Sequence, residues 1–143
     1  MARKIIPDVV HDQELVQLAP DATVREAARQ MAARQVGATL VGKSGRLVGI
    51  FTERDLLARV VACGLDPAKT KLAEVMTRDP ATVAPSQRSL DALHVMDEGG
   101  FRHLAVVDRG RVRGIVSLRD FVTGEIEAMQ AERAEQEALR ERC

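Results

Sequence analysis

The first clear pattern in the sequence is an amphipathic helix. Its apolar positions recur every three or four residues and are Val24, Ala27, Ala28 and Met31. This spacing places them on one face of an α-helix. Thr23 precedes the run and Glu26 follows three residues later, a spacing typical of a capping box, and we expect the helix to end before Gly37.

Two short apolar runs after this helix predict a β-hairpin. The runs are Ala38–Val41 and Leu47–Phe51, and the Lys-Ser-Gly-Arg sequence at residues 43–46 is typical of a hairpin turn. A further strand is expected at Leu15–Leu18, before the helix, and a second helix is expected to start at Thr52. The predicted order of elements is therefore β-α-β-β-α.

The same order occurs a second time along the chain. A shift of 65 residues lays Leu15–Arg59 over Pro80–Gly124 without a gap. The identical pairs are Ala19/Ala84, Pro20/Pro85, Ala27/Ala92, Met31/Met96, Val41/Val106, Gly45/Gly110, Arg46/Arg111, Gly49/Gly114, Ile50/Ile115, Arg54/Arg119 and Asp55/Asp120. The elements of the second copy are strands at Ala81–Val83, Leu104–Val107 and Val112–Val116, a helix ending at Gly99-Gly100, and a last helix starting at Ser117. Such self-similarity predicts an internal structural repeat.

One copy of about 60 residues is too small to bury both faces of its sheet, so the two copies are expected to share a core. We predict an α/β (α+β) fold of two β-α-β-β-α repeats, packed sheet to sheet with pseudo-two-fold symmetry, plus a C-terminal helical extension. The predicted boundaries are 1–66 for the first repeat with an N-terminal lead-in, 67–125 for the second, and 126–143 for a charged helix. Its narrow apolar stripe (Ile126, Met129 and Leu139) favours a solvated helix over a coiled coil and leaves open a contact with a dimer mate.

Composition narrows the class of protein. Lys plus Arg and Asp plus Glu both total 21, so the formal net charge is zero, and aromatic residues make up only 2%. These values argue against a nucleic acid or an anionic membrane as partner. Pro7 and Asp8 interrupt what an export signal would need, and no apolar run approaches the roughly 20 residues that cross a bilayer. We therefore expect a soluble, cytoplasmic protein.

The sequence offers few groups for metal binding or catalysis. Cys63 and Cys143 are isolated, and His11, His94 and His103 lack the spacing of metal ligands, so no metal is expected. No nucleophile stands near a base at a spacing typical of catalysis. We therefore expect a protein that is not an enzyme.

The most informative motif is a strand-turn-helix element present in both copies, at residues 49–55 and 114–120. Each has a hydroxyl at the helix start, Thr52 or Ser117, and an acid three residues later, Asp55 or Asp120. One interpretation is structural, since such pairs cap helices. The other is functional, because helix N–H groups bind phosphate and a carboxylate can accept both hydroxyls of a ribose.

Small residues near this motif suggest room for a nucleotide base. Gly49 and Gly114 are expected to leave the strand edge open to a flat base, and Ala27 and Ala92 to keep the neighbouring helix from filling the cleft.

The doubled unit, with GIFTERD at residues 49–55 and GIVSLRD at 114–120, resembles a tandem pair of cystathionine β-synthase (CBS) domains, a Bateman module of the stand-alone bacterial type. The resemblance covers about residues 5–125. It implies a regulatory homodimer that binds AMP, ADP or ATP, with NAD or S-adenosylmethionine as alternatives, in clefts between the repeats. It also implies an unidentified regulated protein, which we expect to be a separate polypeptide.

By position, the resemblance implies ligand-binding roles for eight residues. Thr52 and Ser117 match the hydroxyl contacts to phosphate or ribose, Asp55 and Asp120 the ribose-binding carboxylates, and Ile50 and Ile115 lie in the strands before them.

The other two, Arg102 and His103, match places where the family presents basic groups to phosphates. Gly37 and Ala38 stand there in the first copy, so phosphate-rich ligands should favour one cleft. Arg102 as a solvated strand-edge charge and His103 as a satisfied interfacial histidine remain alternatives. Ala105, where the family usually has proline, departs from the pattern.

Two hypotheses about function follow. In one, the chain is a non-catalytic, nucleotide-sensing module; in the other, it is a structural dimerisation module without a ligand. Only the first predicts that adenine nucleotides raise the melting temperature, because a ligand that binds the folded state stabilises it.

Overall fold

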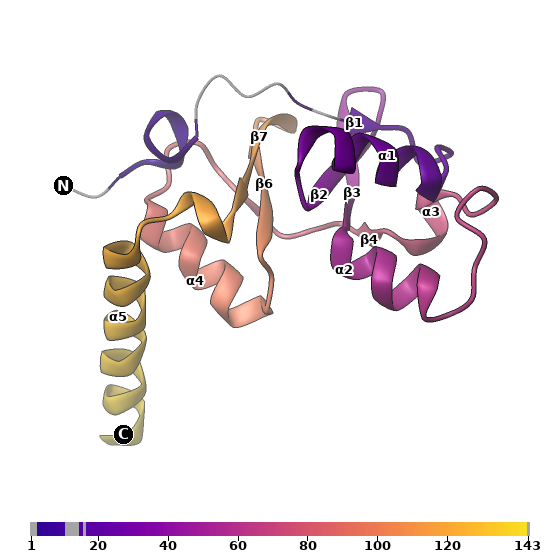
Figure 1. The fold of residues 1–143 in the computed structure, drawn as a ribbon. Coiled ribbons are helices and arrows are strands. Elements are labelled where there is room, and N and C mark those ends of the chain that lie inside the picture. The colour runs from indigo at the N-terminus through magenta and orange to yellow at the C-terminus, as the bar shows by residue number, and fades with distance from the viewer. Residues whose placement is uncertain (1–2, 11–14, 16, 143) are drawn as a thin grey trace. The chain divides into compact units, whose positions relative to one another are not determined.

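A computed structural model describes residues 3–10, 15 and 17–142 of the chain (Figure 1). The chain divides into two compact units. The first-repeat unit contains the described residues of 14–80 and 108–112, and the second-repeat unit contains those of 1–13, 81–107 and 113–143. Each unit is built around one of the two predicted repeats.

The first-repeat unit has a four-stranded sheet in the order β1-β2-β3-β4. Its elements, in chain order, are β1 (Gln17–Leu18), α1 (Val24–Arg34), β2 (Ala38–Lys43), β3 (Arg46–Thr52), α2 (Glu53–Asp55), η2 (Leu56–Val61), α3 (Leu72–Val75) and β4 (Thr77–Arg78). β1 runs parallel to β2, whereas β2, β3 and β4 pair antiparallel. The helix that α2 begins continues directly into η2.

Helix α1 forms as its sequence predicts. The Thr23 hydroxyl accepts a hydrogen bond from the backbone N–H of Glu26 and so caps the helix start. The helix ends at Gln35, whose φ of 55° is left-handed. Its apolar face enters a core made of Val24, Ala27, Met31, Val41, Phe51, Val60, Leu72, Val75 and Met76.

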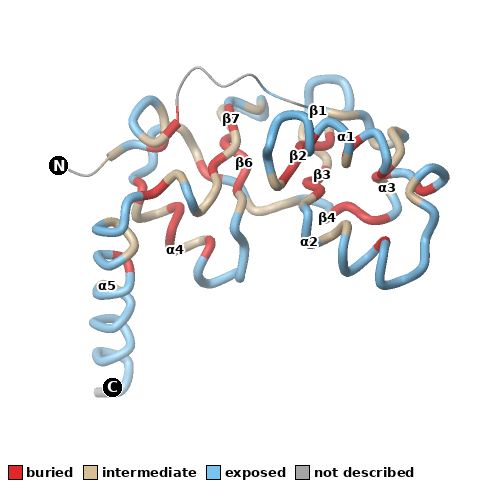
Figure 2. Tube along the Cα trace, in the orientation of Figure 1, coloured by how far each residue is buried: buried red, intermediate tan, exposed pale blue. Residues whose placement is uncertain are grey.

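The second-repeat unit repeats this plan with a three-stranded sheet in the order β5-β6-β7. Its elements are η1 (Ile5–Val9), β5 (Thr82–Val83), α4 (Ser89–Gly99), β6 (His103–Asp108), β7 (Arg111–Ser117), η3 (Leu118–Asp120) and α5 (Thr123–Arg142). α4 ends at Gly100, whose φ of 71° confirms the predicted glycine C-cap. Buried residues (red in Figure 2) line the inner face of α4 and strand β6.

The two predicted hairpin turns are confirmed and have the same backbone form. Ser44 and Gly45 have φ values of 54° and 78°, and Arg109 and Gly110 have values of 53° and 79°. Two consecutive left-handed residues are typical of the type I′ turn, which suits the twist of a two-stranded hairpin. This requirement explains why a glycine recurs at the second position of each turn.

The last helix departs from the prediction that it starts at Ser117. The helical turn η3 ends at Phe121, whose backbone is extended, and α5 begins only at Thr123. Met129 of α5 is buried in the core that α4 also lines, whereas Leu139 is 61% exposed. The second half of α5 is therefore a solvated helix, as its sequence predicts.

The N-terminal segment, residues 3–10, packs in the second-repeat unit and not with the repeat that it precedes. Ile5 is fully buried there, and its N–H donates to the carbonyl of Gln87 over 2.9 Å. The Ile6 N–H donates to the carbonyl of Pro85 over 3.0 Å. The expected boundary at 1–66 therefore differs from the spatial grouping, because the apolar side chain of Ile5 completes the core over α4.

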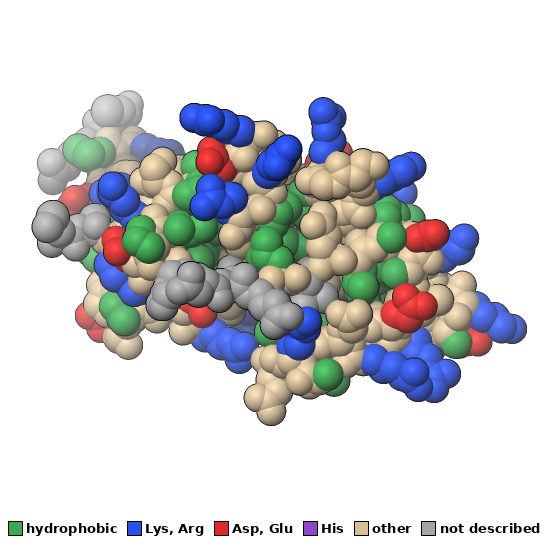
Figure 3. Space-filling view, turned by 90° about the horizontal axis from the view of Figure 1, so that it is seen from above, with side chains coloured by type: hydrophobic (Ala, Val, Ile, Leu, Met, Phe, Trp, Pro, Cys, Tyr) green, Lys and Arg blue, Asp and Glu red, His purple; other side chains and the backbone are tan. Residues whose placement is uncertain are grey.

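Charged side chains are scattered over the surface. On the face shown in Figure 3, Lys and Arg side chains (blue) and Asp and Glu side chains (red) are spread out, with hydrophobic side chains (green) between them. Among the described helices, none is both long and apolar enough to span a membrane.

Candidate functional site

In the first-repeat unit, Thr52 and Asp55 hold each other at the start of α2. The Asp55 carboxylate oxygen Oδ2 accepts hydrogen bonds from the Thr52 N–H at 2.9 Å and from the Thr52 hydroxyl at 3.0 Å. The Thr52 hydroxyl oxygen accepts in turn from the Asp55 N–H at 3.2 Å. This is a complete capping box, so both residues have a structural role whether or not a ligand binds.

Arg59 adds a cation to this turn. Its Nε lies 3.6 Å from Asp55 Oδ1, and its Nη1 donates to the carbonyls of Val75 and Met76 at 3.1 Å each. Asp55 is therefore tied to the segment that leads into β4. Sequence reasoning missed Arg59, although an acid and a base four residues apart on a helix are a known signal for an ion pair.

In the second-repeat unit, the carboxylate of Asp120 caps the corresponding turn with fewer partners. Its Oδ2 accepts from the Ser117 N–H at 2.7 Å. Gly124 stands at the position that corresponds to Arg59, so the equivalent cation is absent. Since an ionised carboxylate offers about four lone-pair sites, Asp120 keeps more capacity to accept hydrogen bonds than Asp55 does.

Both turns are attached to their sheets in the same way. The Glu53 N–H donates to the carbonyl of Gly37 at 2.9 Å, and the Leu118 N–H donates to the carbonyl of Arg102 at 2.9 Å. The structure therefore brings Arg102, which is exposed, next to the Ser117–Asp120 turn. His103 begins β6 and is half-buried.

The expectation that Gly49 leaves a strand edge open is wrong. β3 is paired with β4 at this point, where Gly49 lies opposite Arg78. A methyl group added at Gly49 would lie 2.5 Å from Met76 Sδ and 2.9 Å from the Thr77 carbonyl oxygen. The glycine allows close packing of the β4 segment, a strand that the sequence pattern did not reveal, and not the approach of a base.

Of the other small and apolar residues of the expected site, three are buried and Ile115 is half-buried. Ala27 and Ala92 are fully buried in the cores of their units, so they shape those cores. Ile50 is 6% exposed and pairs with Thr77, and Ile115 in β7 is half-buried.

Substitution of two glycines tests this packing argument. We expect Gly49→Ala to destabilise the protein by about 1–3 kcal/mol, because the Thr77 carbonyl cannot move without disturbing β4. Gly124→Ala is the matched control: no atom lies within 4 Å of an added methyl group there, and alanine favours the helix by about 0.5–1 kcal/mol. Urea denaturation of both variants measures the effect, and equal midpoints would contradict it.

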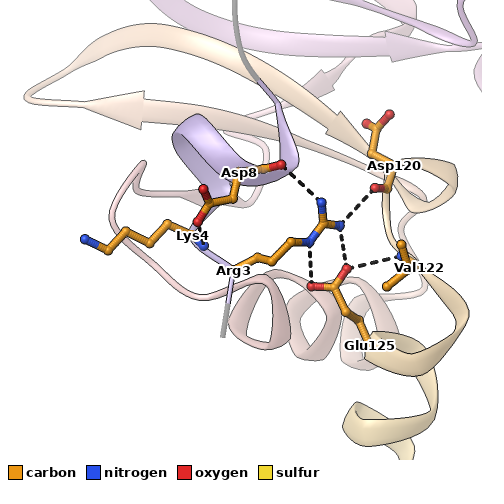
Figure 4. Close-up of polar contacts among 6 residues, drawn as sticks. All are labelled: Arg3, Lys4, Asp8, Asp120, Val122 and Glu125. Atoms are coloured by element: carbon orange, nitrogen blue, oxygen red, sulfur yellow. Dashed lines mark hydrogen bonds and ion pairs between the residues drawn. The ribbon is translucent and has the colours of Figure 1, made fainter. Parts of the chain in front are cut away.

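Arg3 joins the N-terminal segment to α5 beside the second turn (Figure 4). Its Nε and Nη2 donate to the two carboxylate oxygens of Glu125 at 3.1 and 2.6 Å. These hydrogen bonds lower the pKa of Glu125 to about 2, against the opposing effect of burial. Glu125 also caps α5, since its Oε1 accepts from the Val122 N–H at 3.1 Å.

This low pKa predicts a stability that depends on pH. Because the pKa of Glu125 is about 2 in the folded protein and about 4.5 ordinarily, its contribution is complete above pH 4.5 and is lost as the pH falls toward 2. We expect wild type to lose about 1–2 kcal/mol more than Glu125→Gln on acidification from about pH 6 to 3, a figure reduced because Arg3 is one-third exposed. Glu137→Gln, in an exposed pair with Arg133, is the control. Urea denaturation at each pH gives the free energy of unfolding. If this free energy changes with pH in the same way in wild type and Glu125→Gln, the prediction is contradicted.

Comparison with known proteins identifies the family. The model of the CBS domain matches residues 6–62 and again residues 72–125. The chain belongs to the CBS domain family. CBS domains are in general regulatory, non-catalytic modules, and the predicted pair of repeats is confirmed.

Relatives of this CBS pair occur as parts of larger proteins. A CBS domain-containing protein of Arabidopsis thaliana, CBSCBSPB3, is 41% identical over 109 residues, which cover 76% of this chain and 20% of the relative. Arabinose 5-phosphate isomerase KdsD of Yersinia pestis is 34% identical over 119 residues, 82% of this chain and 36% of that enzyme. The chain thus spans about a fifth of the plant relatives that it matches.

Solved CBS structures share the fold along most of the chain. The CBS domain protein PAE2072 of Pyrobaculum aerophilum, whose structure is a complex with AMP, is 28% identical with a TM-score of 0.76. The match covers 86% of this chain and 95% of that protein.

Proposed function

We propose that this CBS pair is a non-catalytic regulatory module of the cytoplasm that binds an adenine nucleotide or a related adenosyl ligand. AMP, ADP and ATP are the first candidates, with NAD and S-adenosylmethionine as alternatives. The module signals its occupancy to a separate partner protein. The observation that carries the proposal is the hydroxyl-and-acid turn present in both repeats, at Thr52–Asp55 and Ser117–Asp120.

The AMP complex of the Pyrobaculum relative supports this choice of ligand class, since the alignment covers nearly all of that protein. The chemistry of the turns agrees with it. A carboxylate in the first turn of a helix can accept two ribose hydroxyls, and a hydroxyl beside it can donate to a phosphate oxygen.

The two turns should not bind equally well. Asp55 is engaged by the Thr52 hydroxyl and by Arg59, whereas the side chain of Asp120 accepts only from the Ser117 N–H among the described contacts. The backbone of Arg102 is bonded to Leu118 of the second turn, so its basic side chain starts beside that turn. A phosphate-rich ligand should therefore prefer the Ser117–Asp120 turn, as the sequence comparison of the two repeats predicts.

The second candidate function is a dimerisation module without a ligand. The capping hydrogen bonds at both turns favour it, because they explain a hydroxyl and an acid at this spacing without a nucleotide. A measurement of ligand binding distinguishes the two candidate functions, because only the first requires a ligand.

A thermal-shift panel makes that separation. We expect at least one of AMP, ADP, ATP, NAD and S-adenosylmethionine to raise the melting temperature, because ligand at 100 times its Kd adds about 2.7 kcal/mol to stability. Ribose 5-phosphate, which lacks the base, is the control and should give a smaller shift. If no member of the panel shifts the melting temperature at millimolar concentration, the ligand-free module is the better description.

We also propose that the working form is a homodimer. Leu57 and Val61 are 66% and 61% exposed and lie one helical turn apart on η2. The corresponding residues of the second repeat are Val122, which is 55% exposed, and Ile126, which is half-buried. The exposed pair on η2 suits a second copy of this chain, since a two-fold dimer brings the same patch of both copies together.

A further inference from the structure

Arg3 is the centre of a polar cluster that joins three separate segments of the second-repeat unit (Figure 4). Its guanidinium binds both carboxylate oxygens of Glu125 on α5, at 3.1 and 2.6 Å. Nη1 also donates to the carbonyl of Asp8 at 3.1 Å, and Nη2 reaches the carbonyl of Asp120 at 3.4 Å. Arg3 therefore contacts the N-terminal segment, the second candidate ligand turn and the last helix at once.

The backbone of Arg3 is held as firmly as its side chain. The Ser89 N–H at the start of α4 donates to the Arg3 carbonyl at 2.7 Å, and the Ser89 side chain hydrogen-bonds to Glu125. Ser89 is 1% exposed. A guanidinium held in this way is pre-organised for planar, bidentate contacts, which makes it a suitable anchor for a neighbouring turn.

The Asp120 side chain is left available by this arrangement. In Figure 4 the Asp120 carbonyl faces Arg3, whereas its carboxylate points away from the guanidinium. Arg3 thus holds the backbone of the ligand turn without neutralising the acid that would bind a ribose.

The first repeat anchors its turn through a different arginine. There Arg59, on the helix of the turn itself, contacts the Asp55 carboxylate directly and binds the carbonyls of Val75 and Met76. The corresponding residue of the second repeat is Gly124. At the next position of each repeat, the first repeat has Val60, which is fully buried, and the second has Glu125, which is bound to Arg3. The second repeat therefore has no arginine at this position of its own helix, and its turn is contacted by Arg3 of the N-terminal segment.

We propose that Arg3 is a positioning residue for the Ser117–Asp120 turn, and that docking of the N-terminal segment and binding of an adenine nucleotide at Asp120 are energetically coupled. The inference rests on the proposed function of that turn. By linkage, a segment that favours binding is itself held more tightly when ligand is bound, so occupancy of the second turn is transmitted to residues 3–10. In the first turn the corresponding anchor is Arg59, which binds carbonyls of its own unit.

The test measures AMP and ATP binding by calorimetry in an Asp55→Asn background, which limits the measurement to the second turn. Arg3→Met removes the anchor but leaves Glu125 without its partner. Arg3→Met/Glu125→Gln removes the anchor and the unpaired charge together, while the glutamine oxygen can still accept from the Val122 N–H. We expect both variants to bind the preferred nucleotide roughly 5- to 20-fold more weakly than the background protein, a range typical of coupling between sites.

A second measurement separates positioning from general loss of structure. Hydrogen exchange of the Ile5 and Ile6 amides, which are bonded to Gln87 and Pro85, should slow when nucleotide saturates the background protein. The same nucleotide should leave these amides unchanged in Arg3→Met/Glu125→Gln. The matched control is Arg59→Met in the protein that keeps Asp55. In this control, nucleotide should still slow hydrogen exchange at Ile5 and Ile6.

The outcomes distinguish the inference from the function on which it rests. If Arg3→Met/Glu125→Gln binds with the affinity of its background and nucleotide still slows exchange at Ile5, Arg3 is only a structural residue and the inference is overturned, while the proposed function stands. If the unmodified protein binds neither AMP nor ATP, nucleotide sensing by these probes fails and the coupling fails with it.

Discussion

Asp120→Asn should remove nucleotide binding at the second turn and leave binding at the first turn in place. Asparagine keeps a side-chain oxygen that can accept from the Ser117 N–H, now bonded at 2.7 Å, so the turn should keep its cap. What it loses is the negative charge and one of the two acceptor oxygens. Hydrogen bonds to a charged group are worth about 1.5–3 kcal/mol each, so affinity should fall by about 100-fold or more.

Calorimetry with AMP and ATP measures this loss as a missing site in the stoichiometry. Asp91→Asn is the matched control, because Asp91 caps the start of α4 through the Arg88 N–H at 2.9 Å in the same unit. It changes a cap of the same geometry and should leave both affinity and stoichiometry unchanged. Full stoichiometry in Asp120→Asn would show that the ligand, if any, binds elsewhere.

Asp120→Ala is a less specific test. The sequence alone suggests that this substitution costs little stability, because an exposed acid in a first helical turn contributes only through the dipole. The structure shows the carboxylate capping Ser117, so alanine would also cost about 0.5–2 kcal/mol for the lost cap. A drop in affinity could then come from a loosened turn, which is why asparagine is preferred.

The local parts of the fold were predictable because their causes lie within a few residues. The capping of α1 by Thr23, the left-handed Gly100 and both type I′ turns depend on neighbours in sequence. The hydroxyl-and-acid turns belong to the same class, since Thr52 and Asp55 satisfy each other over one helical turn. A doubled pattern then predicted two repeats.

The missed parts depend on contacts between distant segments. β4 has only two residues, and its pairing with β3 is what turns Gly49 from an open edge into a close contact with Met76. Arg3 and Glu125 are 122 positions apart, so no local pattern could connect them. Composition and periodicity carry no information on such pairs, and the role of a glycine or an arginine follows only when the partner segment is known.

The second large effect concerns assembly: Leu57→Glu/Val61→Glu should convert the proposed homodimer into a monomer. Both side chains are more than half exposed, so the substitutions should leave the fold of the first-repeat unit intact. In a dimer they would bring carboxylates into an apolar contact, where burial of an unpaired charge is strongly unfavourable. We expect the dissociation constant of the dimer to increase by at least about 100-fold, since the loss of apolar contact and the added charge both weaken the interface.

Sedimentation velocity over a range of concentrations measures this change, and Leu139→Glu is the control because Leu139 is equally exposed but lies on the solvated end of α5. Dissociation by Leu139→Glu alone would place the interface on the C-terminal helix. If the unmodified chain is a monomer throughout, the apolar pair needs another partner. A monomeric Leu57→Glu/Val61→Glu protein that still binds nucleotide would show that each chain carries a complete ligand site. Loss of binding together with the dimer would instead mean that assembly holds the ligand turns in place.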